Sequence, residues 1–372
     1  MVGVGGQMNK RGKIAIVAAV AILVVVAILL IPVMQNLLAM FFQKRIPTYS
    51  EYRVQRDLIV DANGGTVNNF TIDVPVLSDV NRTGQVQFVS NVVYDPAPTF
   101  LSKAGLEWAV WEHDVLQGSQ RSTVRVTFDL RVEAKVWSCA STESLNISDL
   151  PAPLVSRYSG DEWMIVVNDP GIQTRAQDIV QGGRNVHHAL ESIYRWVIGN
   201  IHYPQGSADR DSQSSVDTLA SKVGDCDDQA MLFCALARAS GIPAWVQLGA
   251  LYSSSGNKWG GHGWVQTYIP LKGGSGEYVT IDTVNREFLI WSPNRYVDYT
   301  DDGNGEHLRD YYFSFYCSYE PGTYSIGDGP IYSESYVSLM HHDSSEFIRL
   351  VDLNPFQNLA MAEIRRSDTV LA

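Results

Sequence analysis

The stretch "SKVGDCDDQAMLFCALARASGIP", residues 221–243, places one helix between two helix-breaking signals. Gly224 precedes the helix, Gly241 and Pro243 follow it, and nearly every residue between them favours helical structure. Cys226 falls in the first turn, where unpaired backbone N–H groups and the helix dipole stabilise an anion. Because the thiolate is the nucleophilic form of cysteine, this position predicts a reactive thiol.

Three aspartates, Asp225, Asp227 and Asp228, surround that thiol. Their negative charge raises the pKa of a neighbouring thiol and so opposes the helix dipole. Their side-chain oxygens also suit the free N–H groups of a first helical turn, and we expect them to cap the helix. The dipole alone is therefore insufficient, and a thiolate at Cys226 needs an imidazolium partner.

His262, in "GGHGWVQTYIP", is the candidate partner, and the glycines on both sides leave its ring accessible. A histidine base needs a group that fixes its tautomer and stabilises its cation. Asp282, in "VTIDTV", follows the hairpin loop "LKGGSG". If the strands on either side of that loop pair antiparallel, His262 and Asp282 lie side by side. The sequence thus predicts a catalytic set for acyl transfer made of Cys226, His262 and Asp282.

The segments around these residues predict an α+β domain over residues 170–300. An apolar stripe at helical spacing precedes the cysteine helix, formed by Val186, Leu190, Ile193 and Val197. Three runs of period two follow it, "AWVQLGAL", "GWVQTYIP" and "EYVTIDTV", and are typical of strands. Helices followed by an antiparallel sheet indicate α+β architecture.

These residues, in this order, resemble the transglutaminase-like cysteine superfamily over roughly residues 185–290. The resemblance rests on "GDCDDQAMLFCALARASGIPAW", "HGWVQTYI", "VTIDTV" and the upstream segment "IYRWVIGNIHYPQG". It implies a papain-like α+β core, catalytic roles for Cys226, His262 and Asp282, a thioester intermediate, a protein or peptide substrate and no cofactor.

Members of that superfamily cross-link glutamine to amines, hydrolyse peptides or amides, or have lost activity. We expect a protease or amidase rather than a cross-linking enzyme. The alternative is a catalytically silent surface module that binds protein or glycan partners. The Cys226 backbone N–H and a side chain would hold the oxyanion, with Tyr203 and Gln205 as candidates. Trp264 is either a core residue or a wall of the substrate groove.

The chain before this domain has a different pattern. Residues 46–150 alternate with period two, which predicts a β-sandwich of immunoglobulin-like kind. Residues 301–372 are expected to form an extension packing on the core, with a strand in "DYYFSFYCSY" and a helix in "NPFQNLAMAEIRR". The strand "VRVTFDLRVEAKV" is expected to bury one face, made of Val124, Val126, Phe128, Leu130, Val132, Ala134 and Val136.

An uncharged apolar run, Ile14–Met34, precedes these domains and is long enough to cross a membrane. Basic residues cluster before it, which predicts a cytoplasmic segment at residues 1–13 and an extracytoplasmic location for everything after residue 45. A cleaved signal peptide is the alternative, but its apolar region would be shorter. We therefore expect a single-pass protein anchored by residues 14–34.

The composition excludes several other classes. The 372 residues carry a formal charge of −12, which argues against a nucleic-acid partner. The four cysteines form no C-x-x-C pair, so a thiolate zinc site is not expected. "DYTDDGNGE", from Asp298, resembles a calcium loop, but Arg309 occupies the twelfth position and excludes an EF-hand. We expect no metal site.

Overall fold

The computed structural model describes residues 44–350, except 83, 104, 205–211, 314 and 320–328. The expected anchor at 14–34 and the expected helix in "NPFQNLAMAEIRR" lie outside these residues. Within the described part of the chain, no helix has both the length and the apolar character that a membrane crossing requires. The fold is α+β with mostly antiparallel sheets, as the sequence predicts.

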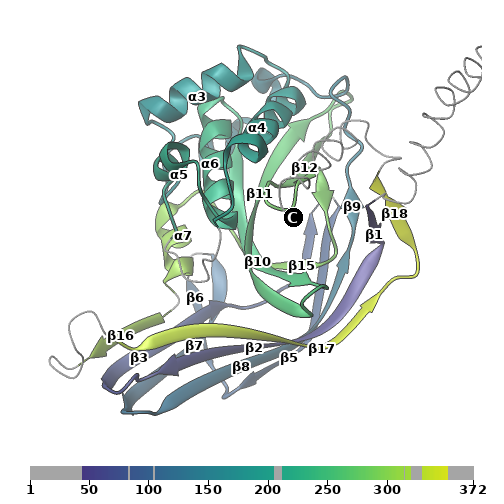
Figure 1. Cartoon of the computed structure of the whole chain (residues 1–372). Helices are drawn as coiled ribbons and strands as arrows, with labels where there is room; N and C mark the ends of the chain where they lie inside the picture. The colour runs from purple at the N-terminus through teal and green to yellow at the C-terminus, as the bar shows by residue number, and fades with distance from the viewer. Residues whose placement is uncertain are drawn as a thin grey trace, which may run out of the picture.

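Four helices and an antiparallel sheet form the part of the molecule that contains Cys226 (Figure 1). The predicted apolar stripe of α4 is fully buried, and the cysteine helix α6 begins at Cys226. The helices are α3 (Pro170–Val180), α4 (Val186–Asn200), α5 (Ser215–Ser221) and α6 (Cys226–Ala239).

The sheet beside these helices, here called the core sheet, has the strand order β13-β12-β11-β10-β15. β11 and β12 pair antiparallel across the predicted hairpin, with Val265 opposite Ile281. This confirms the three predicted strands and the hairpin. The bounds are β10 (Ala244–Ser253), β11 (Lys258–Pro270), β12 (Gly276–Asp282), β13 (Glu287–Phe288) and β15 (Arg295–Thr300).

Two further antiparallel sheets, ordered β17-β2-β8-β5-β4 and β16-β3-β7-β6, form what we call the two-sheet module. Alternate residues of β2, β3 and β8 are buried, and both sheets contribute to one hydrophobic core. The strands are β2 (Tyr49–Asp61), β3 (Thr66–Pro75), β4 (Val80–Arg82), β5 (Gln85–Asp95), β6 (Thr99–Lys103), β7 (Leu106–Gln117), β8 (Arg121–Glu133), β16 (Phe315–Tyr319) and β17 (Ile331–Asp343).

Buried glutamines join the module to the core sheet. Gln85 Nε2 donates to Gln247 Oε1 over 2.8 Å, and Gln266 Nε2 donates to Gln85 Oε1 over 2.9 Å. Gln87 exchanges two hydrogen bonds with the backbone of Val297. Because a buried amide must be hydrogen-bonded, these pairs fix how the core sheet sits on β5.

The segment after β15 has two locations. Helix α7 (Gly305–Tyr312) packs beside the core, whereas β16 and β17 join the module by pairing with β3 and β2. The extension expected to pack on the core therefore also completes both sheets of the N-terminal half. Small elements link the two parts: β1 (Arg45–Pro47), β9 (Lys135–Val136), η1 (Ile147–Asp149), α2 (Ala152–Arg157), β14 (Ile290–Trp291) and β18 (Phe347–Arg349).

Candidate active site

Cys226 is the first residue of α6, and the sequence around it explains why the helix begins there. Asp225 is the N-cap, and its side chain and that of Asp228 form a capping box across the first turn. A side chain on Gly224 would collide with Asp228 Cβ at 2.8 Å, so the approach to the helix requires glycine. The expected capping role of Asp225 and Asp228 is thus confirmed.

His262 and Asp282 lie side by side, as the hairpin predicts. His262 Nε2 is 2.8 Å from Asp282 Oδ2, and both side chains are largely buried. A carboxylate accepts this hydrogen bond only if Nε2 carries the proton. The neutral imidazole then presents an unprotonated Nδ1, which can serve as a base.

Asp282 is held by three donors besides the imidazole. Arg295 Nη1 donates to Asp282 Oδ2 over 2.6 Å, and Asn285 donates through its side chain to Oδ2 and through its backbone N–H to Oδ1. Burial would raise the pKa of Asp282, but His262 and Arg295 outweigh burial and hold the pKa of this carboxyl well below its usual range. Asp282 is therefore an oriented anion.

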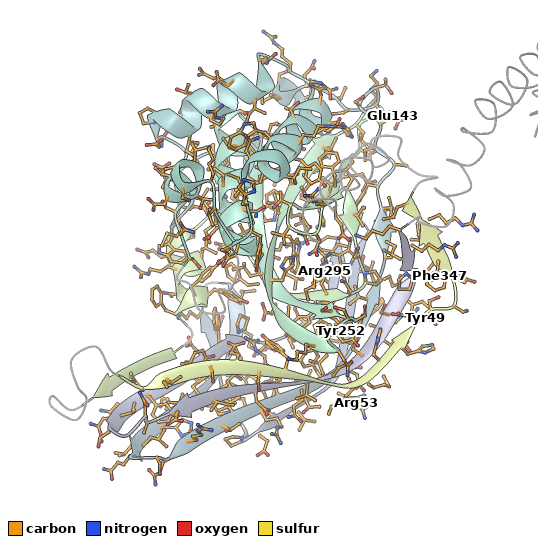
Figure 2. All side chains as sticks on the ribbon, in the orientation of Figure 1. Tyr49, Arg53, Glu143, Tyr252, Arg295 and Phe347 are labelled. Atoms are coloured by element: carbon orange, nitrogen blue, oxygen red, sulfur yellow. The ribbon has the colours of Figure 1, made fainter. Side chains whose placement is uncertain are left out.

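Arg295 connects Asp282 to a second buried acid. Its Nη2 donates to Glu287 Oε2 over 2.6 Å, and Lys44 Nζ lies 2.7 Å from Glu287 Oε1. Figure 2 shows Arg295 in the interior of the molecule and Arg53 on the outer face of the two-sheet module. Two cations thus balance two anions behind the imidazole, which is the condition for burying such charges.

The Cys226 thiol is less acidic than its helical position suggests. Burial, and then the charge of Asp227, raise the pKa of Cys226, while a hydrogen bond from the Gly263 backbone N–H lowers it by less. Burial and its hydrogen bond with Asp227 also raise the pKa of Asp225 to about 8, so Asp225 is largely protonated at neutral pH. This agrees with the prediction that the helix dipole alone is insufficient for a thiolate at Cys226, and it adds burial as the largest cause of the raised pKa.

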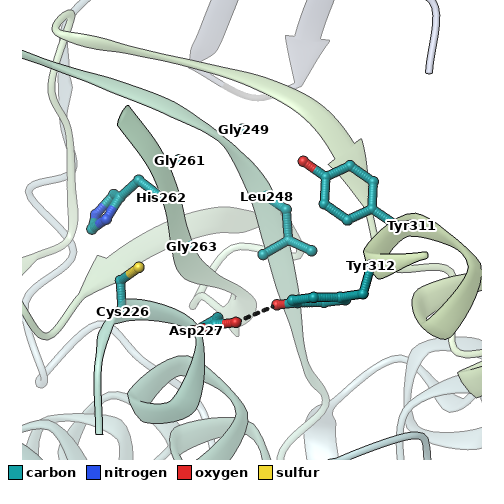
Figure 3. Close-up of a pocket in the computed structure, with 9 residues that line it drawn as sticks. All are labelled: Cys226, Asp227, Leu248, Gly249, Gly261, His262, Gly263, Tyr311 and Tyr312. Atoms are coloured by element: carbon teal, nitrogen blue, oxygen red, sulfur yellow. Dashed lines mark hydrogen bonds between the residues drawn. The ribbon is translucent and has the colours of Figure 1, made fainter. Parts of the chain in front are cut away.

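A cavity of about 240 Å³ brings the thiol and the imidazole together. Figure 3 shows Cys226 and His262 on one side of this cavity and Tyr311 and Tyr312 on the other. The remaining lining residues are Asp227, Leu248, Gly249, Gly261 and Gly263.

Tyr311 and Tyr312, the last residues of α7, are site residues that the sequence analysis missed. Tyr312 Oη donates to Asp227 Oδ2 over 2.8 Å, next to the nucleophile, and Tyr311 Oη donates to Asp298 Oδ1 over 2.8 Å. The aromatic run "DYYFSFYCSY" was the available signal, but nothing in it indicates that its first residues would reach a helix 85 positions earlier.

The other candidate residues have separate outcomes. Tyr203 is half-exposed and close to the site: burial, and then Cys226, raise its pKa to about 12, so its hydroxyl is a neutral donor. Gln205 lies outside the described residues. Trp264 is 1% exposed and does not line the cavity; its ring packs 5.8 Å from that of His262. Trp264 is therefore a core residue.

Asp225, Cys226 and Asp227 bring one ligand atom each within 4.8 Å of one another, the spacing of a metal site. Asp227 already accepts hydrogen bonds from Ser212 and Tyr312. A metal bound here would also occupy the thiol. In the "DYTDDGNGE" segment, Asp298 pairs with Arg56 and Asp301 with Arg238, and Asp302 Oδ2 lies 3.0 Å from His307 Nδ1.

Comparisons with known proteins place a family resemblance over the part of the chain that holds these residues. The model of the Transglutaminase-like superfamily matches residues 173–283, a range that contains Cys226, His262 and Asp282. A comparison with curated protein sequences gives no match.

One solved structure shares most of the fold. A candidate cysteine protease from Cytophaga hutchinsonii superposes with a TM-score of 0.57 and 15% identity, over 82% of this chain and 96% of that one. The periplasmic domain of TgpA from Pseudomonas aeruginosa matches with a TM-score of 0.30 and 11% identity, over 62% of this chain and 87% of that one. The chain therefore has a transglutaminase-like core within a larger α+β fold shared with the Cytophaga protein.

Proposed function

We propose that the protein is a cysteine enzyme that forms a thioester with peptide or amide substrates, with Cys226 as nucleophile, His262 as base and Asp282 as the orienting carboxylate. The observation that carries the proposal is the 2.8 Å contact between His262 Nε2 and Asp282 Oδ2, made by an imidazole that shares a cavity with Cys226. A base oriented by a third group next to a thiol is the arrangement that nucleophilic catalysis requires.

The proposed first step begins with a neutral thiol, because the pKa of Cys226 is raised. His262 Nδ1 takes the thiol proton as sulfur attacks the carbonyl carbon, and a C–S bond forms. The imidazolium, stabilised by Asp282, then protonates the departing amine as the C–N bond breaks. Water then attacks the thioester carbonyl and gives a proton to His262 as the new C–O bond forms. The C–S bond breaks, the carboxylic acid leaves, and the imidazolium returns the proton to the Cys226 sulfur.

The Cys226 backbone N–H and the Tyr203 hydroxyl are the proposed donors to the oxyanion. Tyr203 suits this role because its raised pKa keeps the hydroxyl protonated. We propose hydrolysis rather than cross-linking. Product analysis in the presence of a primary amine separates the two, since cross-linking transfers the acyl group to the amine.

A thiol-reactive probe tests the proposal. The full chain is treated with iodoacetamide near neutral pH, and the labelled cysteines are identified by mass spectrometry. We expect Cys226 to react faster than Cys139, Cys234 and Cys317, and we expect His262→Ala to abolish that advantage. Slow labelling of all four cysteines, unchanged by His262→Ala, would refute the catalytic assignment.

A catalytically silent surface module is the second candidate. The observation that favours it is the position of the half-buried Cys226 thiol beside Asp227, because a nearby negative charge raises the pKa of a thiol and a neutral thiol is a poor nucleophile without an effective base. In such a module the fold would persist for binding a protein or glycan. The same labelling experiment separates the two candidates.

We also propose that residues 14–34 anchor the protein in the cell membrane, with residues 1–13 in the cytoplasm and the later domains outside. The proposal rests on the uncharged apolar run and the basic residues before it. Protease treatment of intact cells should digest the domains after residue 45 when they are extracytoplasmic. Resistance of these domains in intact cells, with digestion after lysis, would overturn this location.

A further inference from the structure

The cavity beside Cys226 has a mostly apolar wall. Leu248 and the rings of Tyr311 and Tyr312 face it, together with three glycines that add no side chain. Asp227 is the one carboxylate in the lining, and its oxygens are already engaged. Oδ2 accepts from Tyr312 at 2.8 Å and from Ser212 at 2.7 Å, and Oδ1 accepts from the Asp228 backbone N–H at 3.1 Å.

This lining discriminates between chemical groups. A charged substrate side chain would lose part of its hydration and, apart from the reacting thiol and imidazole, meet no unpaired polar side chain in the wall, which is costly. An acidic side chain would also meet the negative charge of Asp227. An apolar side chain would gain from leaving water, since Leu248 and the two tyrosine rings provide contact surface.

The size of the cavity fits a single side chain. Its volume is about 240 Å³, and a protein cavity of about 150 Å³ is enough to hold a benzene ring. It is smaller than the roughly 300–1,000 Å³ of pockets for whole small-molecule ligands. The space therefore accommodates one leucine-sized or phenylalanine-sized group beside the reacting sulfur.

The tyrosine wall is fixed in place by contacts that extend to the two-sheet module. Tyr311 Oη donates to Asp298, which pairs with the buried Arg56 of β2 at 3.1 Å. At the other end of α7, a side chain on Gly305 would collide with the Trp163 backbone nitrogen at 2.5 Å, so the helix is packed closely there. A cavity with a preorganised wall selects by shape and polarity.

We propose that this cavity is the subsite for an uncharged, apolar side chain next to the scissile bond, and that Tyr312 and Leu248 determine this specificity. The inference rests on the proposed function, because it assigns a substrate residue to the same thiol. It names the substrate class as peptides or amides with a leucine-like or phenylalanine-like residue at one position adjoining the bond that is cleaved.

A positional series of peptide amides tests the subsite in the full chain. Each position flanking the scissile bond carries Ala, Leu, Phe, Asp or Lys in turn. We expect Leu and Phe to exceed Asp and Lys in kcat/KM by about tenfold or more at one position, the usual scale for a hydrophobic pocket. Equal values at every position, or a preference for Asp or Lys, would overturn the proposal.

Variants of the wall give a second readout. Tyr312→Ala and Leu248→Ala, on different elements, should each shift the preference toward bulkier side chains. Tyr312→Phe keeps the ring and should keep the preference. Phe313→Ala is the matched control, because Phe313 is the next residue, is exposed and does not line the cavity. A shift with Phe313→Ala as large as with Tyr312→Ala would overturn the assignment.

Alkylation of Cys226 separates this proposal from the proposed function, since it requires no turnover. N-benzyl iodoacetamide and iodoacetate are compared with iodoacetamide, with each rate normalised to that of glutathione. We expect Cys226 to react faster with the benzyl reagent, and we expect Tyr312→Ala and Leu248→Ala to alter this preference. That result supports the subsite even if no peptide is cleaved. Peptide cleavage without any side-chain preference rejects the subsite and leaves the proposed function standing.

Discussion

Arg295 and His262 bind the same oxygen of Asp282. Arg295 Nη1 donates to Oδ2 over 2.6 Å, and His262 Nε2 is 2.8 Å from that atom. The guanidinium keeps the carboxyl ionised, and an ionised carboxyl accepts the imidazole proton that fixes the tautomer. Asn285 Nδ2 donates to this oxygen as well, so the carboxylate cannot rotate without losing several bonds.

Asp282→Asn tests this arrangement. An amide at this position can favour the wrong imidazole tautomer, and we expect kcat to fall by about 10⁴-fold. We expect the free energy of unfolding to fall by about 1.5–3 kcal/mol, because a charged hydrogen bond to Arg295 is lost. Asp343→Asn is the matched control, since Asp343 contacts His341 at 2.9 Å on an exposed strand end. Equal kinetic losses in the two variants would contradict the role of Asp282.

Asp227→Asn should make Cys226 more acidic. The Asp227 charge is the second contribution, after burial, to the raised pKa of the thiol. Removing the charge lowers that pKa, and a thiol whose pKa is lower by about one has roughly ten times more thiolate at any pH well below the pKa. The alkylation rate of Cys226, measured between pH 6 and 10, should rise accordingly. Asp217→Asn is the control, because Asp217 is an exposed acid of α5, and it should leave the pH profile unchanged. A higher pKa of Cys226 in Asp227→Asn would contradict the explanation.

Gly263→Ala should separate the histidine strand from the cysteine helix. A Cβ at Gly263 would lie 3.0 Å from Leu248 Cδ2 and 3.3 Å from Asp227 Cα, so the Leu248 side chain and the start of α6 must give way by a few tenths of an ångström. Because sub-ångström placement matters for catalysis, we expect kcat/KM to fall by about 10²-fold. Gly260→Ala is the control, since a Cβ there meets nothing within 4 Å. Steady-state kinetics that show no difference between the variants would rule out this close packing as a constraint.

Tyr203→Phe tests the oxyanion donor. Loss of one donor typically costs about 10²–10³-fold in kcat, with a smaller effect on KM. Tyr252→Phe is the control, because the Tyr252 hydroxyl bonds Asn257 in a hairpin outside the cavity. A change in KM alone would assign Tyr203 to substrate binding instead.

Arg56→Met should destabilise the protein far more than Arg53→Met. Arg56 is buried between Asp298 and Glu334, and its removal leaves acids without their cation, at a cost of about 3–5 kcal/mol. Arg53 pairs with Asp129 at the surface, where such a bond contributes about 1 kcal/mol or less. Urea unfolding of the two variants measures this difference in stability. Similar unfolding midpoints would contradict the prediction.

Local patterns in the sequence were sufficient for much of the core. The alternation of apolar and polar residues on both sides of the "LKGGSG" loop predicts the β11–β12 hairpin. That hairpin places His262 beside Asp282. Helical spacing likewise predicts the buried stripe of α4. These features depend on residues close together in the chain, so periodicity and turn signals determine them.

The features that the sequence did not predict depend on contacts between residues far apart in the chain. Arg295 and Asn285 around Asp282 carry no periodic signal, and Tyr312 reaches Asp227 only because α7 folds back onto the core. The pairing of β17 with β2 joins residues at opposite ends of the described chain. The sequence indicated that the aspartates raise the pKa of Cys226, but the larger contribution of burial was missed because the extent of burial is a tertiary property.

The pairing of β17 with β2 also determines when the molecule can be completed during synthesis. β2 leaves the ribosome long before Ile331 does, so one edge of β2 stays unpaired until β17 has been synthesised. Helix α7 emerges in the same late interval, and the cavity lacks its tyrosine wall until then. Nascent chains stopped at Thr300 should therefore hold a thiol site that lacks its tyrosine wall, and this site can be assembled only after α7 has been synthesised.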